Sequence, residues 1–486
     1  MVAAQDATMY WLSGRTRNDL FMLYCFDDSG RSGAQLREFV ARRSAEIADL
    51  SVRLRELPGD LDYPAWVRCE FRAEQFVEHI LPEPDWPSVC EVLGKLLGTG
   101  VDAAARPWRL HVFRGVVGAP GGAGPAMVVV LQMSHALADG RRGAEIARGL
   151  FSEVAESALV ASVIGAAPVA RALGGRSAGF GRRLGAAAVE AAPVNPIHVN
   201  SVLALLRMPI QFARTAIRGY QAFRAQQELA ELTTAGRLPG PGPAFTPSLV
   251  NRSDSTDGHA HQVRMIVCDA ERLRIPGCTV TVVALTAVSI ALDRYLTARG
   301  ERADRLGAQV PMALSDNRIA ARNNYRSLGV DLFIDEPDPP ARANKIAAVL
   351  ADRRTRAQHP LLTAQDRVTA VTPAPLLRRD IERYPLDTVP DSIAGHTVVS
   401  SVHRGPADLT FGGAPVRFTG GFPAIGSVMH LTHGVHGLGD TVTVSIHADA
   451  AALPDIDTYT GLVRDALNEI FDCAIAELGE PETSTG

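Results

Sequence analysis

Three residues in one short segment, His135, Asp139 and Gly140, have the types and the spacing of a catalytic turn. A neutral imidazole has a pKa of about 6.5, so it can take a proton from a hydroxyl group near neutral pH. The carboxylate can hold the turn or pair with an arginine from elsewhere in the chain. The glycine permits a positive φ and the close approach of a substrate or a second segment. The pattern predicts that His135 is a general base, a role that contributes roughly 10²–10⁴-fold to a rate.

Taken alone, the same pattern also fits a core histidine beside a helix-capping aspartate, because three fixed residues in six positions carry little information. The sequence around it favours a positioned site. The apolar run 127–130 predicts a buried strand before the turn, and helix-period sequence begins at Arg141. The end of a rigid strand can hold a reactive side chain in place. Ser134 is not interpreted as a nucleophile, because adjacent residues of an extended segment point to opposite faces.

The rest of the chain alternates between period-2 and helix-period segments, which predicts an α/β protein. Strands or extended segments are expected at 20–26, 66–80, 108–117, 261–268, 309–312, 398–401, 416–421 and 441–448. Helices are expected at 34–57, 88–97, 201–232, 279–296, 341–355, 364–381 and 455–478. The glycine-rich segment 118–125 is interpreted as a hairpin loop, because it precedes a strand and lacks the Lys-Ser/Thr ending of a nucleotide-binding loop.

The sequence also holds candidate residues for two other kinds of site, a metal site and a serine-hydrolase site. His430, His433 and His436 suggest a metal site, but on a strand the first and third share a face and the second points the other way. With no H-E-x-x-H pattern and no nearby cysteine pair, no metal is predicted, and one of these histidines is expected to line the substrate path. A serine hydrolase of the α/β class is disfavoured, because the one G-x-S-x-G match, 175–179, lies in an Ala- and Gly-rich stretch rather than between a strand and a helix.

Length and composition set the broad class. A chain of 486 residues is long for one core, so two domains are expected, with a boundary in the Gly/Pro-rich and polar sequence 236–261. A net charge of −4 does not favour nucleic-acid binding. Six scattered cysteines fit free thiols in a reducing cytosol. We expect a cytoplasmic protein, since neither a signal peptide nor a run of about 18 apolar residues is evident.

The helix expected at 201–232 carries four arginines, Arg207, Arg214, Arg218 and Arg224, beside its apolar residues. One interpretation is a bridge that packs into the core between two domains. The other is a basic amphipathic surface for peripheral contact with a membrane or a lipid droplet.

The segment from His135 to Gly140 resembles the H-x-x-x-D-G core of the CoA-dependent acyltransferase superfamily. Within it, the chain is most similar to the actinobacterial wax ester synthase/diacylglycerol acyltransferase family. Further segments that resemble this family are 6–12, 66–79, 101–108, 309–312 and 323–338. Two features depart from the family pattern: Ser134 stands where many members have a histidine, and 400–406 (SSVHRGP) has an extra residue and no asparagine relative to S-N-V-P-G-P.

The resemblance implies a fold of two chloramphenicol-acetyltransferase-like lobes with a central tunnel, as in condensation domains. The N-terminal lobe would span 1–185, a helical crossover 186–250 and the C-terminal lobe 251–486. The resemblance also implies a set of site residues. His135, Asp139 and Gly140 would form the catalytic turn; Ser134, Asn324, Ser400 and Ser401 would contact substrate; Trp108 and Arg318 would be structural, with Arg318 holding Asp139.

The reaction implied is transfer of a fatty acyl group from acyl-CoA to an alcohol acceptor, with His135 as base, no acyl-enzyme and no cofactor apart from acyl-CoA as substrate. The acceptor would be a long-chain alcohol, a diacylglycerol or a specialised hydroxylated metabolite. Two alternatives stay open. One is condensation chemistry with a carrier-protein donor or an amine acceptor. The other, motivated by Ser134 and segment 400–406, is a lipid-binding relative without turnover.

Overall fold

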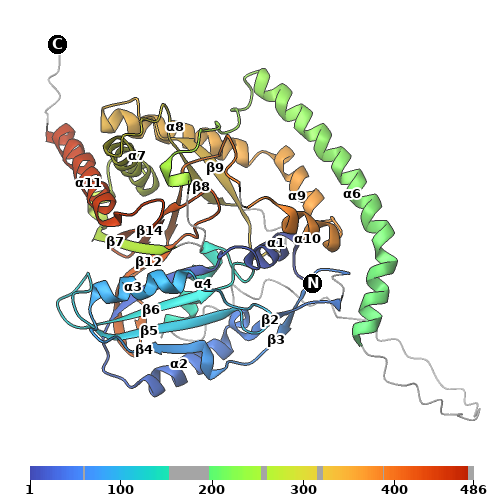
Figure 1. The fold of residues 1–486 in the computed structure, drawn as a ribbon, viewed down its shortest axis with the longest axis horizontal. Helices are drawn as coiled ribbons and strands as arrows, with labels where there is room; N and C mark the ends of the chain where they lie inside the picture. Colours follow the sequence, from blue (N-terminus) through green and yellow to red (C-terminus); the bar gives the residue numbers. More distant parts are fainter. Residues whose placement is uncertain (59–60, 153–195, 253–259, 315–320, 387, 480–486) are drawn as a thin grey trace, which may run out of the picture.

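The computed structural model describes residues 1–58, 61–152, 196–252, 260–314, 321–386 and 388–479, with the backbone alone for 196–207 and 477–479. Within these ranges, two six-stranded sheets form two lobes, with helices over their outer faces (Figure 1). The predicted α/β class with two lobes is confirmed.

The sheet of the first lobe is built around β6, the strand that leads into the His135 turn. Its strand order is β11-β12-β1-β6-β5-β4. Every residue of β6 is buried, and alternate side chains enter two different cores: Met127 and Val129 enter one, Val128 and Val130 the other. A strand covered on both faces has to be apolar throughout, which explains the unbroken apolar run. The strands are β1 (Leu20–Asp27), β4 (Phe76–His79), β5 (Trp108–Val116), β6 (Ala126–Met133), β11 (Thr410–Phe411) and β12 (Ala414–Phe422).

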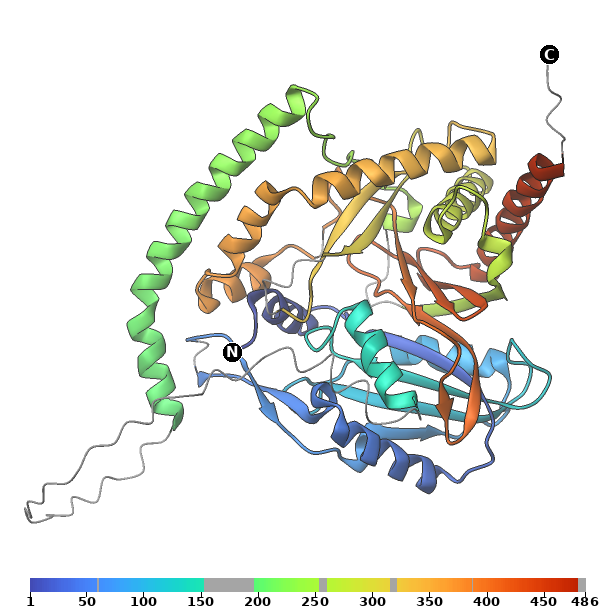
Figure 2. The same ribbon diagram turned by 180° about the vertical axis from the view of Figure 1, so that it is seen from behind.

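The second half of the chain completes this first sheet. β12 pairs antiparallel with β1 along its length, from Phe21 opposite Phe422 to Phe26 opposite Val416. Figure 2 shows this strand, in orange, reaching from the second lobe into the first. Residues of the range 251–486 therefore belong to both lobes in space, while the boundaries given for the three regions stay a prediction.

The sheet of the second lobe has the order β7-β14-β13-β10-β8-β9. Its strands are β7 (His261–Asp269), β8 (Gly307–Ala313), β9 (Tyr325–Asp331), β10 (Thr397–His403), β13 (Leu431–Leu438) and β14 (Thr441–Asp449). The helices α7 (Val280–Ala298), α8 (Pro339–Ala357) and α11 (Ile456–Gly479) pack against one another and bury its aliphatic core.

Among the described residues, α7 alone is long and apolar enough by composition to cross a membrane. The window that meets this test is 72% buried inside the protein. Its side chains, among them Leu285 and Leu292, belong to the core that α8 and α11 complete. The apolar character of α7 is thus accounted for by packing in the second lobe.

Two predicted helices differ from the structure. The helix expected over 34–57 ends earlier, as α2 (Gly33–Glu46), and a short helix η1 (Ala48–Ser51) and β2 (Val52–Arg55) follow. Ile47 is extended and β2 pairs with β3 (Ala65–Arg68), so tertiary pairing outweighs the helical spacing. The helix expected over 364–381 is divided into α9 (Thr363–Thr369) and α10 (Ala374–Arg383), because Pro373 has no N–H to continue the first helix.

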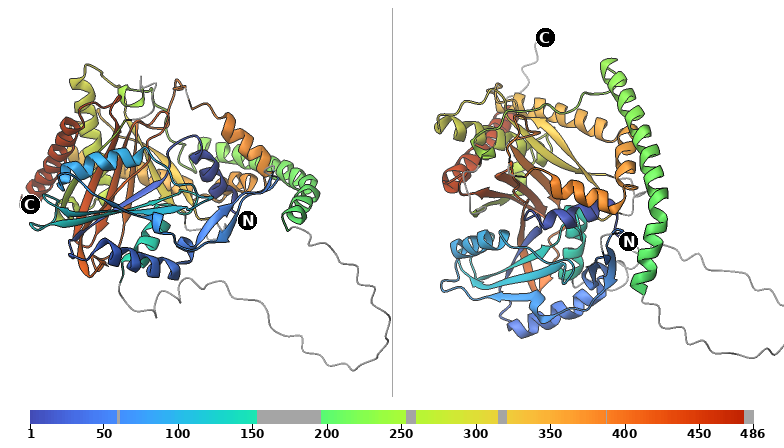
Figure 3. Two further views of the ribbon diagram at one scale, coloured as in Figure 1. Left: turned by 60° about the horizontal axis from the view of Figure 1, so that its bottom comes forward. Right: turned by 45° about the vertical axis from the view of Figure 1, so that its right-hand side comes forward.

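The remaining helices are α1 (Ala4–Ser13), α3 (Trp86–Leu97), α4 (Gly140–Phe151) and α6 (Pro196–Thr234). Figure 3 shows α6, in green, along one side of the molecule and outside both lobes. It packs against α9 and the short helix η6 (Pro360–Leu362). The interpretation of this segment as a core-packing bridge is wrong for residues 210–223, where Phe212 is 48% exposed and Tyr220 65% exposed.

The close contact between the two sheets predicts that adding one methyl group at Gly434 lowers the stability of the protein. A Cβ at Gly434 of β13 would lie 2.2 Å from the carbonyl oxygen of Gly421 of β12. Gly434→Ala is therefore expected to lower the free energy of unfolding by about 1–3 kcal/mol in a denaturant titration. Gly461→Ala on α11 is the control, since a Cβ there meets nothing within 4 Å. Equal stability of the two variants would contradict this packing.

Candidate active site

His135 lies directly after β6, in the turn before α4, and an amide from the second lobe holds its ring. His135 Nδ1 is 2.7 Å from Asn323 Oδ1. The same amide donates from Nδ2 to the backbone oxygen of His135, at 2.7 Å, and to Asp6 Oδ1, at 3.0 Å. Because both acceptors of Nδ2 are fixed, the side-chain amide of Asn323 cannot flip without losing two hydrogen bonds.

This arrangement selects the tautomer of the imidazole. An amide oxygen only accepts hydrogen bonds, so His135 Nδ1 must carry the proton and donate to Asn323. Nε2 then keeps its lone pair, and no described residue forms a hydrogen bond with it. A general base needs such a free lone pair.

Asp6 on α1 anchors the asparagine in turn. Its carboxylate accepts the backbone N–H groups of Asn323, at 2.8 Å, and of Arg322, at 2.9 Å, besides the side-chain amide. The carboxylate is buried, and burial raises the pKa of Asp6 despite these hydrogen bonds, which act in the opposite direction. α1 therefore fixes the segment that holds the histidine.

A charged cluster locks the same segment to the first lobe. Arg322 donates to the Leu137 carbonyl oxygen and pairs with Asp49 at 2.5 Å. Arg142 of α4 donates to both oxygens of Asp49, at 2.9 and 3.0 Å. Burial alone would raise the pKa of Asp49, but the hydrogen bond from Arg142 and the charge of Arg322 outweigh it and hold the pKa below its usual range. Arg322 also lies over the ring of Trp66, at 4.6 Å.

Asp139 supports the turn through backbone groups. Its Oδ1 accepts the N–H of Arg142 as the N-cap of α4, and its Oδ2 accepts the N–H of Asn324 at 3.3 Å. The arginine guanidinium expected to hold Asp139 is not seen among the described residues, where Arg142 and Arg322 pair with Asp49 instead. Arg318, the residue proposed for that role, lies outside the described residues.

The other residues of the turn are placed differently from the expectation. Gly140 opens α4 without a positive φ, and a Cβ there would lie 3.6 Å from Val402 Cγ2, an ordinary contact. The freedom to adopt a positive φ is thus not used here, whereas a second segment, β10, does approach closely. Ser134 is 1% exposed, and its hydroxyl accepts the N–H of Ala136 within the turn.

The structure separates the two serines of β10. Ser400 and Val402 share one face of the strand, and the side chain of Val402 faces Gly140 of the first lobe. Ser401 shares the opposite face with Val399, which belongs to the core of the second lobe. Of the pair, only Ser400 faces the lobe that carries His135.

Trp108 lies in the core of the first lobe. It is 1% exposed and donates from its indole nitrogen to the Leu50 carbonyl oxygen at 2.9 Å. Its ring also stacks on Phe71.

The three histidines at β13 lie apart, with His433 and His436 on the strand and His430 just before it. His433 is buried, with Nδ1 2.9 Å from Thr397 Oγ1 and Nε2 2.9 Å from Tyr459 Oη of α11. His436 lies on the other face, beside Arg404 and Gly421, and His430 lies beside Asp449. No group of three potential ligands among the described residues is placed to hold a metal ion.

The environment of His135 favours the neutral base. Burial lowers its pKa, and the hydrogen bond with Asn323 and the charges of Asp139 and Asp6 oppose the shift only in part. The ring of Tyr325 lies 6.1 Å away, and burial raises the pKa of that phenol, which keeps its hydroxyl protonated.

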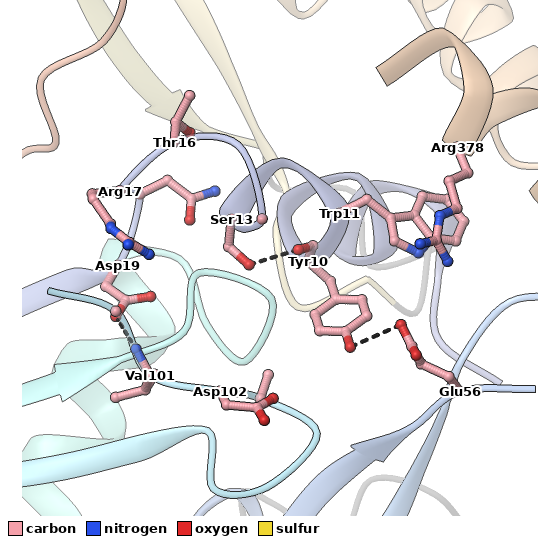
Figure 4. Close-up of a pocket in the computed structure, with 14 residues that line it drawn as sticks. Tyr10, Trp11, Ser13, Thr16, Arg17, Asp19, Glu56, Val101, Asp102 and Arg378 are labelled. Atoms are coloured by element: carbon pink, nitrogen blue, oxygen red, sulfur yellow. Dashed lines mark hydrogen bonds between the residues drawn. The ribbon is translucent and has the colours of Figure 1, made fainter. Parts of the chain in front are cut away.

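A cavity of about 360 Å³ lies next to α1 (Figure 4). Its wall mixes polar and apolar groups: Tyr10 donates to Glu56 at 2.9 Å, Arg17 and Arg378 contribute charge, and Trp11 contributes apolar surface. None of the predicted site residues lines it. The tunnel implied by the family resemblance therefore stays a prediction.

Two family models match the chain. The catalytic domain of wax ester synthase/diacylglycerol acyltransferase matches residues 2–237, and the C-terminal domain of these enzymes matches residues 322–471. The chain belongs to this family. It is an acyltransferase. A search of curated proteins finds no match.

Solved structures share the fold. The wax ester synthase/diacylglycerol acyltransferase from Marinobacter aquaeolei VT8 is 16% identical, with 97% of this chain and 98% of that chain covered and a TM-score of 0.57. A variant of the starter condensation domain of rhizomide synthetase RzmA, in complex with C8-CoA, is 12% identical, with 98% and 94% covered and a TM-score of 0.53. The chloramphenicol-acetyltransferase type of fold is confirmed by these likenesses.

The histidine is evident from the sequence, but the two residues that hold it, Asn323 and Asp6, are not. Asn323 and Asp6 both lie in segments that resemble the family, yet neither was assigned a role in the site. The one available signal was that three polar residues in a row, Arg322 to Asn324, precede a strand. Their partners lie far away in the chain, so spacing alone did not reveal the contacts.

The amide contact predicts the effect of Asn323→Ala. The variant should lower kcat/KM by roughly 10²-fold, because the imidazole loses the hydrogen bond that selects its tautomer. Asn344→Ala is the control, since that asparagine is exposed on α8 and belongs to no part of the site. Asn323→Asp should raise the pKa of His135, so the acid limb of the pH profile should move to higher pH. An unchanged rate in Asn323→Ala would contradict the assignment.

The cap at α4 predicts graded effects at Asp139. Asp139→Ala removes the acceptor for the Arg142 N–H and should lower the free energy of unfolding by about 1–2 kcal/mol, with a loss of activity. Asp139→Asn keeps one oxygen for that N–H and should be milder. Thermal unfolding and turnover of both variants test this. Full stability with unchanged activity in Asp139→Ala would remove Asp139 from the site.

Proposed function

We propose that this chain transfers a fatty acyl group from acyl-CoA to the hydroxyl of an alcohol acceptor, with His135 Nε2 as the general base. The observation that carries the proposal is the bond between His135 Nδ1 and Asn323 Oδ1, because it leaves Nε2 unprotonated. The lowered pKa of His135 keeps this nitrogen a base at neutral pH.

The reaction needs no acyl-enzyme. Nε2 takes the proton of the acceptor hydroxyl while the oxygen attacks the thioester carbonyl carbon. The tetrahedral intermediate collapses, the carbon–sulfur bond breaks, and the departing thiolate of CoA takes the proton back from Nε2. The ester and the free thiol are the products, and His135 ends in its starting state. Holding both substrates together supplies much of the rate.

The surroundings of His135 support direct transfer. The hydroxyl of Ser134 is buried and bonded within the turn, so the neighbouring side chain offers no nucleophile. The carboxylates of Asp139 and Asp6 favour the imidazolium that forms during the step. Asn323 can keep accepting from Nδ1 in both protonation states, so the ring need not move.

Acyl-CoA is the proposed donor because the RzmA starter condensation domain, a structure of the same fold, is described in complex with C8-CoA. The acceptor is proposed to be a long-chain alcohol, a diacylglycerol or a specialised hydroxylated metabolite. A further structure of that domain is described with C8-CoA and Leu-SNAC. Amine acceptors therefore belong in the same assay.

Acceptor-dependent release of thiol tests the proposal. The full chain is incubated with a long-chain acyl-CoA and a fatty alcohol, a diacylglycerol or a simple amine, and free CoA is measured. Release should depend on an alcohol and should fall by roughly 10²–10⁴-fold in His135→Ala. In the wild type, kcat/KM should fall only below neutral pH, because the pKa of His135 is lowered from its ordinary value of about 6.5.

The control is His403→Ala, which replaces an exposed histidine of β10. It should leave the rate unchanged. Release with amines alone would favour condensation chemistry. Binding of acyl-CoA without release for any acceptor would contradict the proposed transfer and favour the binding-only alternative.

A further inference from the structure

α6 carries an apolar stripe that the described residues do not cover. Five large side chains between residues 210 and 223 are exposed: Ile210 55%, Phe212 48%, Ile217 59%, Tyr220 65% and Phe223 57%. They are five of the twelve exposed large apolar side chains among the described residues. Such a concentration on one helix marks an interaction surface rather than scattered surface apolarity.

The stripe lies opposite the face that packs onto the protein. Ala222, Ala225 and Leu229 are buried, and Thr215 donates to the Val371 carbonyl oxygen at 3.0 Å. At 100° per residue these positions share one side of the helix, whereas Phe212, Tyr220 and Phe223 fall on the other. The side of α6 with Ala222, Ala225 and Leu229 thus packs onto the protein, and the large apolar residues of the stripe point outward.

The charges beside the stripe have one sign. Residues 208–227 contain Arg214, Arg218 and Arg224 and no Asp or Glu. None of these arginines forms an ion pair with a described residue. Arg218 is half-buried on the side that packs onto the protein and donates to Gln221 of its own helix, so Arg214 and Arg224 are the exposed charges. The helix therefore offers apolar side chains and free positive charge on a rigid support.

We propose that this face of α6, defined by Phe212, Ile217, Tyr220 and Phe223, docks the protein on the surface of an anionic phospholipid membrane. The apolar side chains would enter the boundary between head groups and acyl chains, and the arginines would contact anionic head groups. Charge complementarity selects this occupant over the same stripe of a second copy, because residues 208–227 of that copy would bring arginines and no acidic side chain to the contact.

The position of α6 suits this role. It runs along one side of the molecule beside α9 and η6 and spans both lobes (Figures 1 and 2). The protein would lie on the membrane along this side. Docking is separate from the chemistry at His135, since no residue of the stripe touches the catalytic turn.

Flotation with phospholipid vesicles tests the proposal. The full chain is mixed with vesicles of phosphatidylcholine alone or with phosphatidylglycerol added, and bound protein is measured at low and high salt. Binding should require phosphatidylglycerol and weaken with salt. The triple variant Phe212→Gln, Ile217→Gln and Phe223→Gln should lose at least roughly tenfold in binding. Thiol release with soluble short-chain substrates should stay unchanged.

The matched control is Ile80→Gln, Val117→Gln and Ile475→Gln, which removes three exposed apolar side chains elsewhere. It should bind as the wild type does. A second variant, Arg214→Gln with Arg224→Gln, should remove the dependence of binding on phosphatidylglycerol. It keeps the proposal testable if the triple variant fails to fold. Wild-type protein that binds neither vesicle would overturn the proposal. So would a triple variant that binds undiminished, or one whose only change is dissociation of an oligomer in light scattering.

Discussion

The candidate site depends on one side-chain amide. Asn323 accepts from His135 Nδ1 and donates to the backbone of the same histidine, so it fixes both the position and the tautomer of the ring. Asp6 accepts three N–H groups from Asn323 and its neighbour and holds the amide in that orientation. The partners lie 188 residues apart along the chain. The reactivity assigned to the histidine is thus a property of the folded molecule.

Because the amide comes from the second lobe, the site is complete only where the two lobes meet. Arg322, adjacent to Asn323, shares the half-buried carboxylate of Asp49 with Arg142 of the first lobe. Removing Asp49 would be costly, since it would leave two partly buried guanidinium groups without their shared carboxylate. The pairing of β12 with β1 joins the lobes a second time. Catalysis and association of the lobes therefore rely on the same contacts.

Local signals predicted the local structure well. The apolar run before His135 and the helical spacing after it were sufficient to place the catalytic turn between β6 and α4. The predictions were wrong or incomplete where contacts between residues distant in the sequence determine the structure. Pairing with β3 ends the helix expected over 34–57, and the transfer of β12 to the first sheet has no local signature. Likewise, Asp139 accepts a hydrogen bond from the backbone N–H of Asn324, whereas the expected partner was an arginine side chain. The contact of Asn323 with His135 belongs to the same class, because asparagine before a strand usually indicates only a turn.

The tautomer of His135 tests the account most directly. Nitrogen-15 NMR of histidine-labelled protein, with the His135 signals assigned from their loss in His135→Gln, reports which ring nitrogen carries the proton above the pKa of the ring. We expect a protonated Nδ1 and an unprotonated Nε2 in the wild type, and a mixture of tautomers in Asn323→Ala. A wild-type ring with the proton on Nε2 would contradict it, since the nitrogen assigned as the base would have no lone pair to offer.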